Sequence, residues 1–205
     1  MKISYAITVC NEAQEFRRLL NFLVPNIREE DEIVVLQDTS KASKEVNRVF
    51  IDFADYIENR MTCIFPGNFA DWKNMLNDHC HGDFIFQLDA DEFMDPETIG
   101  EIPVILEMNP EVDLYWIPRV NTVEGLTEED IQKWHWRVNE QGWVNWPDYQ
   151  GRIYRNSPGI RWEGKVHEKI VGAKLYAYLP DTIHLYHPKT IDKQRQQNSL
   201  YERMQ

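Results

Sequence analysis

Two aspartates and a glutamate follow one apolar segment in the order Asp89-Ala90-Asp91-Glu92. Residues two positions apart in an extended chain point to the same side, so Asp89 and Asp91 can bind one hard cation such as Mg²⁺ or Mn²⁺. Aspartates with this spacing also occur in solvated turns that cap a helix. Here they directly follow the strand pattern of residues 83–88, and carboxylates at the end of a buried strand are costly without a cation. This position favours a metal site.

Polar residues also follow two other predicted strands. Asn11 and Glu12 come after the buried pattern of residues 3–9, and Asp38 comes after residues 32–37. The C-terminal ends of parallel strands meet at one edge of a sheet, where such folds bind their ligands. Asp38 has two interpretations, because it can close an Asx-turn or accept hydrogen bonds from a base or ribose.

Further candidates lie outside these strand ends. Lys73 belongs to a predicted helix, where it either faces a diphosphate or lies on a solvated helix face. Glu168 and Asp148 are candidate proton acceptors. Three histidines of the last third are candidate metal ligands, although each also has a structural interpretation: His167, His184 and His187.

Strand and helix patterns alternate through the first two-thirds of the chain. This order predicts a mostly parallel sheet with helices on both faces. The strands are expected at residues 3–9, 32–37, 62–65 and 83–88. Helices are expected after Asn11 as N-cap, through residues 46–53, over residues 69–81 with Gly82 as C-cap, and from Asp95-Pro96 onward.

The last third has a different pattern. A strand is expected at residues 113–119, followed by an acidic loop at residues 124–130 that donor binding would order. Short strands at residues 152–155, 165–171 and 182–186 and a polar helix at residues 191–205 complete the chain. Between them lies an aromatic segment whose rings suit the faces of sugars, with others expected in the core: Trp134, Trp136, Trp143 and Trp146.

Composition excludes several classes of protein. The chain has 205 residues and a net charge of −12, so it lacks the overall basic character of a general nucleic-acid binder. No apolar run approaches the roughly 18 residues of a membrane span, although contact with a membrane surface stays open. The three cysteines show no metal-binding spacing and fit a reducing compartment. We therefore expect a cytoplasmic protein.

The sequence resembles family 2 glycosyltransferases of the GT-A fold. Matching segments occur in family order at residues 7–20, 32–43, 69–92 and 149–170, and the most specific is GDFIFQLDADE. The stretch from RIYRN to VHE is similar to a bacterial subgroup that builds lipopolysaccharide core. The expected fold is α/β, a Rossmann-like, mostly parallel mixed sheet in one domain, residues 1–205. Within it, residues 1–95 would bind the nucleotide sugar, residues 110–190 the acceptor, and residues 188–205 form a C-terminal helix.

The resemblance also implies roles for individual residues. It implies a nucleoside-diphosphate sugar, with UDP as the expected nucleotide, and Mn²⁺ or Mg²⁺ as cofactor. The expected metal ligands are Asp91 first, then Asp89, with His187 from the far end of the chain; His184 and His167 are alternatives. Glu168 is the expected base and Asp148 the second choice. The residues expected to contact the nucleotide sugar are Asn11, Glu12, Asp38, Lys73, Asp89 and Ala90.

The expected reaction is hexosyl transfer to a glycan or lipid-linked acceptor with inversion at the anomeric carbon. The metal would stabilise the departing diphosphate, and Glu168 would take the proton from the acceptor hydroxyl. Two other functions fit parts of the sequence. A nucleotidyltransferase that makes nucleotide sugars would carry a glycine-rich basic loop after its first strand, whereas this chain has Cys10-Asn11-Glu12-Ala13. A non-catalytic carbohydrate-binding module would use the tryptophans and leave the aspartates unexplained.

Overall fold

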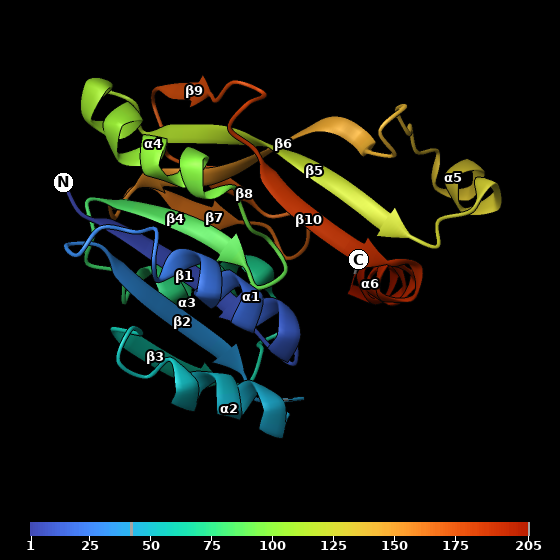
Figure 1. Ribbon diagram of the computed structural model, residues 1–205, viewed down its shortest axis with the longest axis horizontal. Helices are drawn as coiled ribbons and strands as arrows, with labels where there is room; N and C mark the ends of the chain where they lie inside the picture. The colour runs from blue at the N-terminus through green and yellow to red at the C-terminus, as the bar shows by residue number, and fades with distance from the viewer. Residues whose placement is uncertain (42, 205) are drawn as a thin grey trace.

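The computed structural model describes residues 1–41 and 43–204, and a mixed sheet of eight strands forms its centre (Figure 1). Runs of apolar residues at β1, β2 and β4 are buried on both sides, as expected for central strands covered by helices. In chain order the elements are β1 (Ile3–Val9), α1 (Ala13–Leu23), β2 (Glu32–Asp38), α2 (Lys44–Asp52), β3 (Asn59–Cys63), α3 (Phe69–Asn77), β4 (Phe84–Asp89), α4 (Pro96–Met108), β5 (Leu114–Glu124), α5 (Glu128–Trp134), β6 (Val144–Arg155), β7 (Arg161–Glu163), β8 (Lys169–Val171), β9 (Tyr176–Tyr178), β10 (Leu185–Thr190) and α6 (Ile191–Met204).

The strand order places several chain segments at one edge of the sheet. The order is β10-β5-β6-β4-β1-β2-β3, and β9 also pairs with β5. Strands β1 to β4 are parallel, β6 runs antiparallel to both β4 and β5, and β10 is parallel to β5. Therefore β1, β2, β4, β5 and β10 all end at the same edge, where β6 begins. Polar residues on these segments can meet there.

Two hydrophobic clusters fill the two sides of the sheet. The larger one packs α1, α2 and α4 against the sheet through residues such as Leu20, Phe50 and Ile102. The smaller one joins α3 to the short β7–β8 hairpin through Trp72, Leu76 and Trp162. Figure 1 shows α1 and α4 in front of the sheet and α3 behind it. The predicted α/β sheet with helices on both faces is confirmed.

Some predicted boundaries are wrong. Strand β3 covers Asn59–Cys63, so it begins three residues and ends two residues earlier than expected, and α3 ends at Asn77. Gly82 is not a helix cap, because three residues separate it from the helix C-cap Asp78 and its φ is not positive. It is instead packed so closely that a Cβ atom would lie 2.6 Å from the backbone nitrogen of Ser4. Glycine is needed there for space.

The predicted cap of the first helix is also wrong. The N-cap of α1 is Glu12 instead of Asn11, and no side chain caps this helix. The Glu12 carboxylate instead accepts hydrogen bonds from the backbone nitrogens of Cys10 (2.8 Å) and Asn11 (3.0 Å). The side chain therefore closes the loop after β1.

The acidic segment expected to be a loop contains a helix. Residue Thr127 caps α5 by accepting a hydrogen bond from the backbone nitrogen of Asp130, and Asp130 pairs with Arg195 of α6 at 2.9 Å. Acidic residues in a first helical turn favour the helix dipole. Strands β5 and β6 are longer than predicted and form an arm that extends toward α5 (Figure 1).

The remaining late elements agree only in part with the sequence. The expected strands at residues 165–171 and 182–186 become β8 (Lys169–Val171) and β10 (Leu185–Thr190), and α6 ends at Met204. Residue 205 of the predicted helix lies outside the described residues. Within the described part of the chain, no helix has the length and apolar composition to cross a membrane. The division into a nucleotide half and an acceptor half stays a prediction.

Candidate active site

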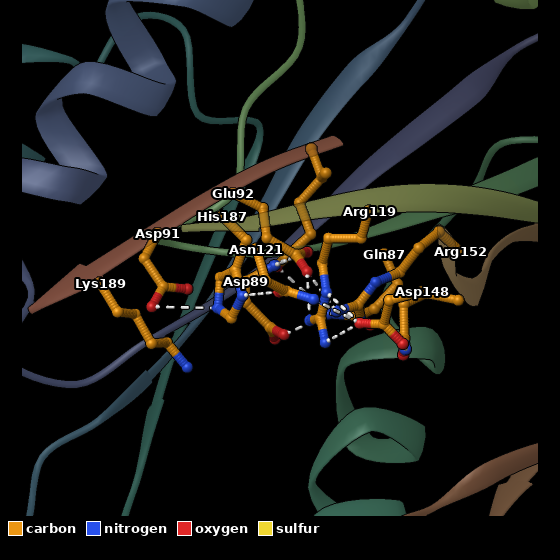
Figure 2. A network of polar contacts seen from close by, with 12 residues as sticks. Gln87, Asp89, Asp91, Glu92, Arg119, Asn121, Asp148, Arg152, His187 and Lys189 are labelled. Atoms are coloured by element: carbon orange, nitrogen blue, oxygen red, sulfur yellow. Dashed lines mark hydrogen bonds and ion pairs between the residues drawn. The ribbon is translucent and has the colours of Figure 1, made fainter. Parts of the chain in front are cut away.

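A tight turn at the end of β4 sends its carboxylates in different directions. Asp89 is the last residue of β4, and the backbone nitrogen of Glu92 donates to its carbonyl oxygen at 2.9 Å. The Glu92 side chain returns to the Asp89 backbone nitrogen at 3.1 Å and is fully buried. Asp91 points toward β10 instead (Figure 2). The acidic segment is therefore built into the sheet edge and is not a solvated turn.

Two arginines neutralise the carboxylates of Glu92 and Asp89. Glu92 Oε1 accepts from Arg119 Nη1 of β5 at 3.0 Å and from Arg152 Nη2 of β6 at 2.5 Å. The same Arg152 nitrogen donates to Asp89 Oδ2 at 2.9 Å. Burial alone would raise the pKa of Asp89, but Arg152, Lys73 and Arg119 hold it well below its usual range. Asp89 is consequently ionised at neutral pH.

Asp148, the second-choice base, is held by several hydrogen bonds. Its Oδ2 accepts from Arg119 Nε (3.0 Å), Arg119 Nη2 (2.8 Å) and Asn121 Nδ2 (2.8 Å), and its Oδ1 accepts from Gln150 Nε2 (2.7 Å). Burial raises the pKa of Asp148, but Arg119 and the amide donors outweigh burial, so the pKa lies below its usual range. These contacts disfavour proton uptake and make Asp148 an anchor for its neighbours.

His187 lies beside Asp91. Its Nδ1 contacts Asn121 Oδ1 at 2.7 Å, and its Nε2 lies 3.5 Å from Asp91 Oδ2. Burial and then Arg119 lower the pKa of His187. For Asp91, burial raises the pKa, but His187 and Lys189 bring it down to about 2. At neutral pH an uncharged imidazole therefore faces an ionised carboxylate, an arrangement with room for a shared cation.

The donor set around this point fits a metal that is completed by a ligand. No three His, Cys, Asp or Glu side chains gather as a metal site anywhere in residues 1–41 and 43–204. Mg²⁺ in nucleotide enzymes is commonly held by one or two carboxylates, with waters and substrate phosphates supplying the rest. Asp91 and His187 suit that role better than Asp89, whose oxygens already accept from Arg152 and from Thr8 Oγ1 at 3.2 Å.

The other two histidine candidates lie elsewhere. His184 Nδ1 is 2.9 Å from the carbonyl oxygen of Asp181, and its ring packs against Trp146 and Tyr186. The ring of His167 packs edge-on against that of Tyr201. Of the three histidines, His187 is the one that the fold brings to Asp91.

Lys73 and Glu168 form a second charged pair at the site. Lys73 Nζ lies 2.6 Å from Glu168 Oε1, and their side chains are only 7% and 14% exposed. The ammonium group also lies 4.2 Å from the centre of the Trp162 ring. The neighbouring Asn74 exchanges two hydrogen bonds with the Trp162 backbone, at 2.8 and 3.0 Å. This burial excludes the solvated helix face as an interpretation of Lys73.

Apart from Lys73 on α3, the predicted nucleotide contacts lie at or just after the ends of β1, β2 and β4. Asp38 accepts from the backbone and hydroxyl of Ser40 (2.9 and 2.8 Å) and from the backbone nitrogen of Phe65 (3.1 Å). Asp38 therefore closes an Asx-turn, which is the structural role expected for it, and fixes the loop after β2. Ala90 is buried, whereas Asn11 is exposed at the neighbouring strand end.

Sequence reasoning missed several residues of this site. Arg119, Asn121, Arg152 and Lys189 are part of it, and Lys189 Nζ donates to Gln197 Oε1 of α6 at 2.5 Å. The signal for the arginines was a charged residue inside an apolar strand pattern. A buried charge requires a partner, and Glu92 is the fully buried carboxylate that both arginines contact.

The four tryptophans of the aromatic segment do not lie in the core. They form two pairs, Trp134 with Trp136 at 4.6 Å and Trp143 with Trp146 at 4.9 Å between ring centres. All four are half-buried. They line the arm formed by β5, α5 and β6, so the expectation that some fill the core is wrong.

Comparison with known proteins agrees with this architecture. The family described as Glycosyl transferase family 2 matches residues 4–177. No curated protein sequence matches the chain. Among solved structures, S. aureus TarS 1–349 in complex with UDP superimposes with a TM-score of 0.68 at 16% identity, over 92% of this chain and 60% of that one. The same fragment in complex with UDP-GlcNAc gives a TM-score of 0.63 at 17% identity, over 92% and 59%.

The solved structures show the fold of this chain, and the family match shows its family. The chain spans about 60% of the length of the TarS fragment, and an identity below 20% carries the fold alone. The family match covers most of the chain, including the β4 turn and the segment that contains Glu168. The chain is thus an α/β domain of the GT-A fold and belongs to glycosyl transferase family 2.

Proposed function

We propose that this chain is a metal-dependent catalytic domain that transfers a sugar from a UDP-sugar to a glycan or lipid-linked acceptor with inversion. The observation that carries the proposal is the pair Asp91 and His187, which face each other at 3.5 Å beside the ionised Asp89. Family membership supports glycosyl transfer, and the UDP and UDP-GlcNAc complexes of TarS support a uridine nucleotide.

The metal proposal rests on Asp91 and His187. Both would hold Mn²⁺ or Mg²⁺ together with diphosphate oxygens, and the bound ion would neutralise charge that develops on the departing diphosphate. Asp89 would keep its ion pair with Arg152 and contact the donor, directly or through water. Its ionised state is stabilised by the arginine, so it can accept hydrogen bonds from a ribose hydroxyl.

Lys73 and Glu168 would have separate roles in binding the donor and in proton transfer. Lys73 would bind the diphosphate, and Glu168 would accept the proton from the attacking hydroxyl. In the ligand-free pair each neutralises the other at 2.6 Å. A diphosphate that draws the ammonium toward itself would release the Glu168 carboxylate for the acceptor. Proton uptake by Glu168 would then depend on a bound donor.

The aromatic arm is our proposed acceptor surface. Its paired half-buried tryptophans offer ring faces of the kind that stack on sugars. The resemblance of residues 152–168 to the lipopolysaccharide-core subgroup favours a lipid-linked glycan, met at a membrane surface in the cytoplasm. Asn11, Glu12, Asp38 and Ala90 would form the wall of the nucleotide pocket at the ends of β1, β2 and β4.

Turnover of a nucleotide-sugar panel tests the proposal. With Mn²⁺ present, release of nucleoside diphosphate should occur with a UDP-sugar and stop on addition of EDTA. Asp91→Ala should abolish release, whereas Asp55→Ala, on the exposed surface, should not. Turnover that persists in EDTA or in Asp91→Ala would refute the metal site. Release of pyrophosphate from a nucleoside triphosphate would identify a nucleotidyltransferase instead.

A second experiment separates the two base candidates. Glu168→Gln should retain UDP binding and lose most transfer, because the amide cannot accept the proton. Asp148→Asn should act differently, since the Asp148 carboxylate is already engaged by Arg119, Asn121 and Gln150. If Asp148→Asn retains binding and loses transfer while Glu168→Gln stays active, our assignment is reversed. Glycan binding without any nucleotide effect would indicate a binding module.

A further inference from the structure

We propose that Asn121 is a positioning residue that fixes the tautomer of His187, so that the Nε2 lone pair faces Asp91. The tautomer follows from contacts within the ligand-free chain. Only its purpose, to prepare His187 for a metal ion, rests on the proposed function. The four side chains form one row, Asp148–Asn121–His187–Asp91 (Figure 2).

The row begins at a group that can only accept hydrogen bonds. Asp148 is ionised, because Arg119 and the amides around it hold its pKa below its usual range. The Asn121 atom 2.8 Å from Asp148 Oδ2 must therefore be the NH₂ group of the amide. The ionised carboxylate thus determines which end of the Asn121 amide faces Asp148. Arg119 holds Asp148 with two nitrogens, so the acceptor itself is fixed.

The orientation of Asn121 determines the protonation of His187. With its NH₂ group on Asp148, Asn121 turns its carbonyl oxygen to His187 Nδ1 at 2.7 Å. An oxygen acceptor at that distance requires a hydrogen on Nδ1. In a neutral imidazole the other nitrogen, Nε2, then carries a lone pair.

That lone pair meets a second acceptor. His187 Nε2 lies 3.5 Å from Asp91 Oδ2, well beyond the roughly 2.7–2.9 Å of a charge-assisted hydrogen bond. Two acceptors directed at each other without a proton between them repel unless a cation lies between them. The row thus prepares one face of His187 for a cation before any ligand binds, in the way that outer-shell partners orient metal-binding histidines.

The strands keep the row in register. Asn121 and His187 are paired residues of the parallel strands β5 and β10, and Arg119 and Asp148 are paired residues of the antiparallel strands β5 and β6. The first two contacts of the row therefore join side chains on neighbouring, paired strands. The bridge between Phe93 and Tyr186 holds the turn with Asp91 beside β10. The geometry requires no induced movement.

Nitrogen NMR of the ligand-free protein at pH 8 tests the inference directly. Histidine ¹⁵N shifts and two-bond couplings report which ring nitrogen carries hydrogen, and His187→Gln assigns the signal. We expect hydrogen on Nδ1 of His187 in the unmodified protein. Hydrogen on Nε2 would overturn the proposal, and this result needs no Asn121 variant to fold.

Two variants test the role of Asn121 itself. Asn121→Leu should release the ring to the Nε2–H tautomer, whereas Asn21→Leu, at an exposed position of α1, should not. In the presence of UDP, Asn121→Leu should also weaken Mn²⁺ binding about 10- to 100-fold by electron paramagnetic resonance, as outer-shell losses do. An unchanged tautomer in Asn121→Leu would overturn the proposal. If the wild-type tautomer is as expected but no Mn²⁺ binds with UDP, the proposed function fails and the tautomer assignment stands.

Discussion

Glu92 provides the most direct test of how the site is held together. Its carboxylate is fully buried and accepts hydrogen bonds from Arg119 Nη1 at 3.0 Å, Arg152 Nη2 at 2.5 Å and the Asp89 backbone nitrogen at 3.1 Å. Glu92→Gln preserves the shape but removes the charge. It also replaces one acceptor oxygen with an NH₂ group, which must then face a donor. Two guanidinium groups lose their shared counter-charge in the same step.

The expected cost follows from those contacts. Hydrogen bonds to charged groups contribute about 1.5–3 kcal/mol each, and removing one partner of a buried ion pair costs about 3–5 kcal/mol. We therefore expect Glu92→Gln to lower the free energy of unfolding by about 3–5 kcal/mol. With a urea slope of about 2.5 kcal/mol per M, the unfolding midpoint should fall by about 1–2 M.

Equilibrium urea unfolding followed by tryptophan fluorescence measures this shift, since the chain has seven tryptophans. Glu101→Gln is the matched control. Glu101 is exposed on α4, so its change should stay within about 0.5 kcal/mol. If the two variants unfold at the same urea concentration as the unmodified protein, the arginine pair does not depend on Glu92 and the reasoning about this network is refuted.

Three further outcomes are expected. Lys73→Gln should weaken UDP binding about 10- to 100-fold by calorimetry and leave uridine binding unchanged, because only the diphosphate loses a charged contact. The pKa of Asp91 falls from 3.8 to about 2 on folding, so its ionised carboxylate stabilises the protein at pH 5 and loses that contribution as the pH falls toward 2. The stability difference between wild type and Asp91→Asn should therefore shrink by about 2 kcal/mol between urea titrations at pH 5 and pH 2. Gly82→Ala should destabilise the fold by about 1–3 kcal/mol, because the added Cβ would lie 2.6 Å from the Ser4 backbone nitrogen. Gly100→Ala on α4, where the added Cβ has open space, should stabilise the fold by about 0.4–1 kcal/mol. Thermal unfolding of both variants measures the two changes.

The sequence predicted the parts of the site that lie on central parallel strands. Continuous apolar runs mark β1, β2 and β4 as buried, and strand ends in such sheets meet at one edge, so the residue pattern alone groups Asp38, Asp89 and Asp91. The same reasoning explains why Gly82 was misjudged. Its position after a helix is typical of a cap, whereas its need for space comes from Ser4, 78 residues earlier.

The rest of the site depends on pairing between distant strands. Periodicity shows that a segment is a strand but not which neighbour it pairs with, so the antiparallel position of β6 between β4 and β5 was not predictable. That position brings Arg152 to Asp89 and Arg119 to Asp148. For the same reason three histidines were equivalent in the sequence. Pairing of β10 with β5 separates them, because it places His187 beside Asn121.

The two sides of the Asp91–His187 pair differ in how firmly they are held. Asp91 follows β4, which is hydrogen-bonded on both sides by β1 and β6, whereas His187 is on β10, the last strand of the sheet. Among the described residues, the backbone partner of β10 outside β5 is Phe93, which bonds to Tyr186 at 2.8 and 3.1 Å. Edge segments open locally at a lower free energy than central ones, so the amide hydrogens of β10 should exchange with solvent faster than those of β4. A ligand that binds both Asp91 and His187 would then hold the terminal strand β10 against the rest of the sheet. Slower amide exchange in β10 would report that binding without any turnover.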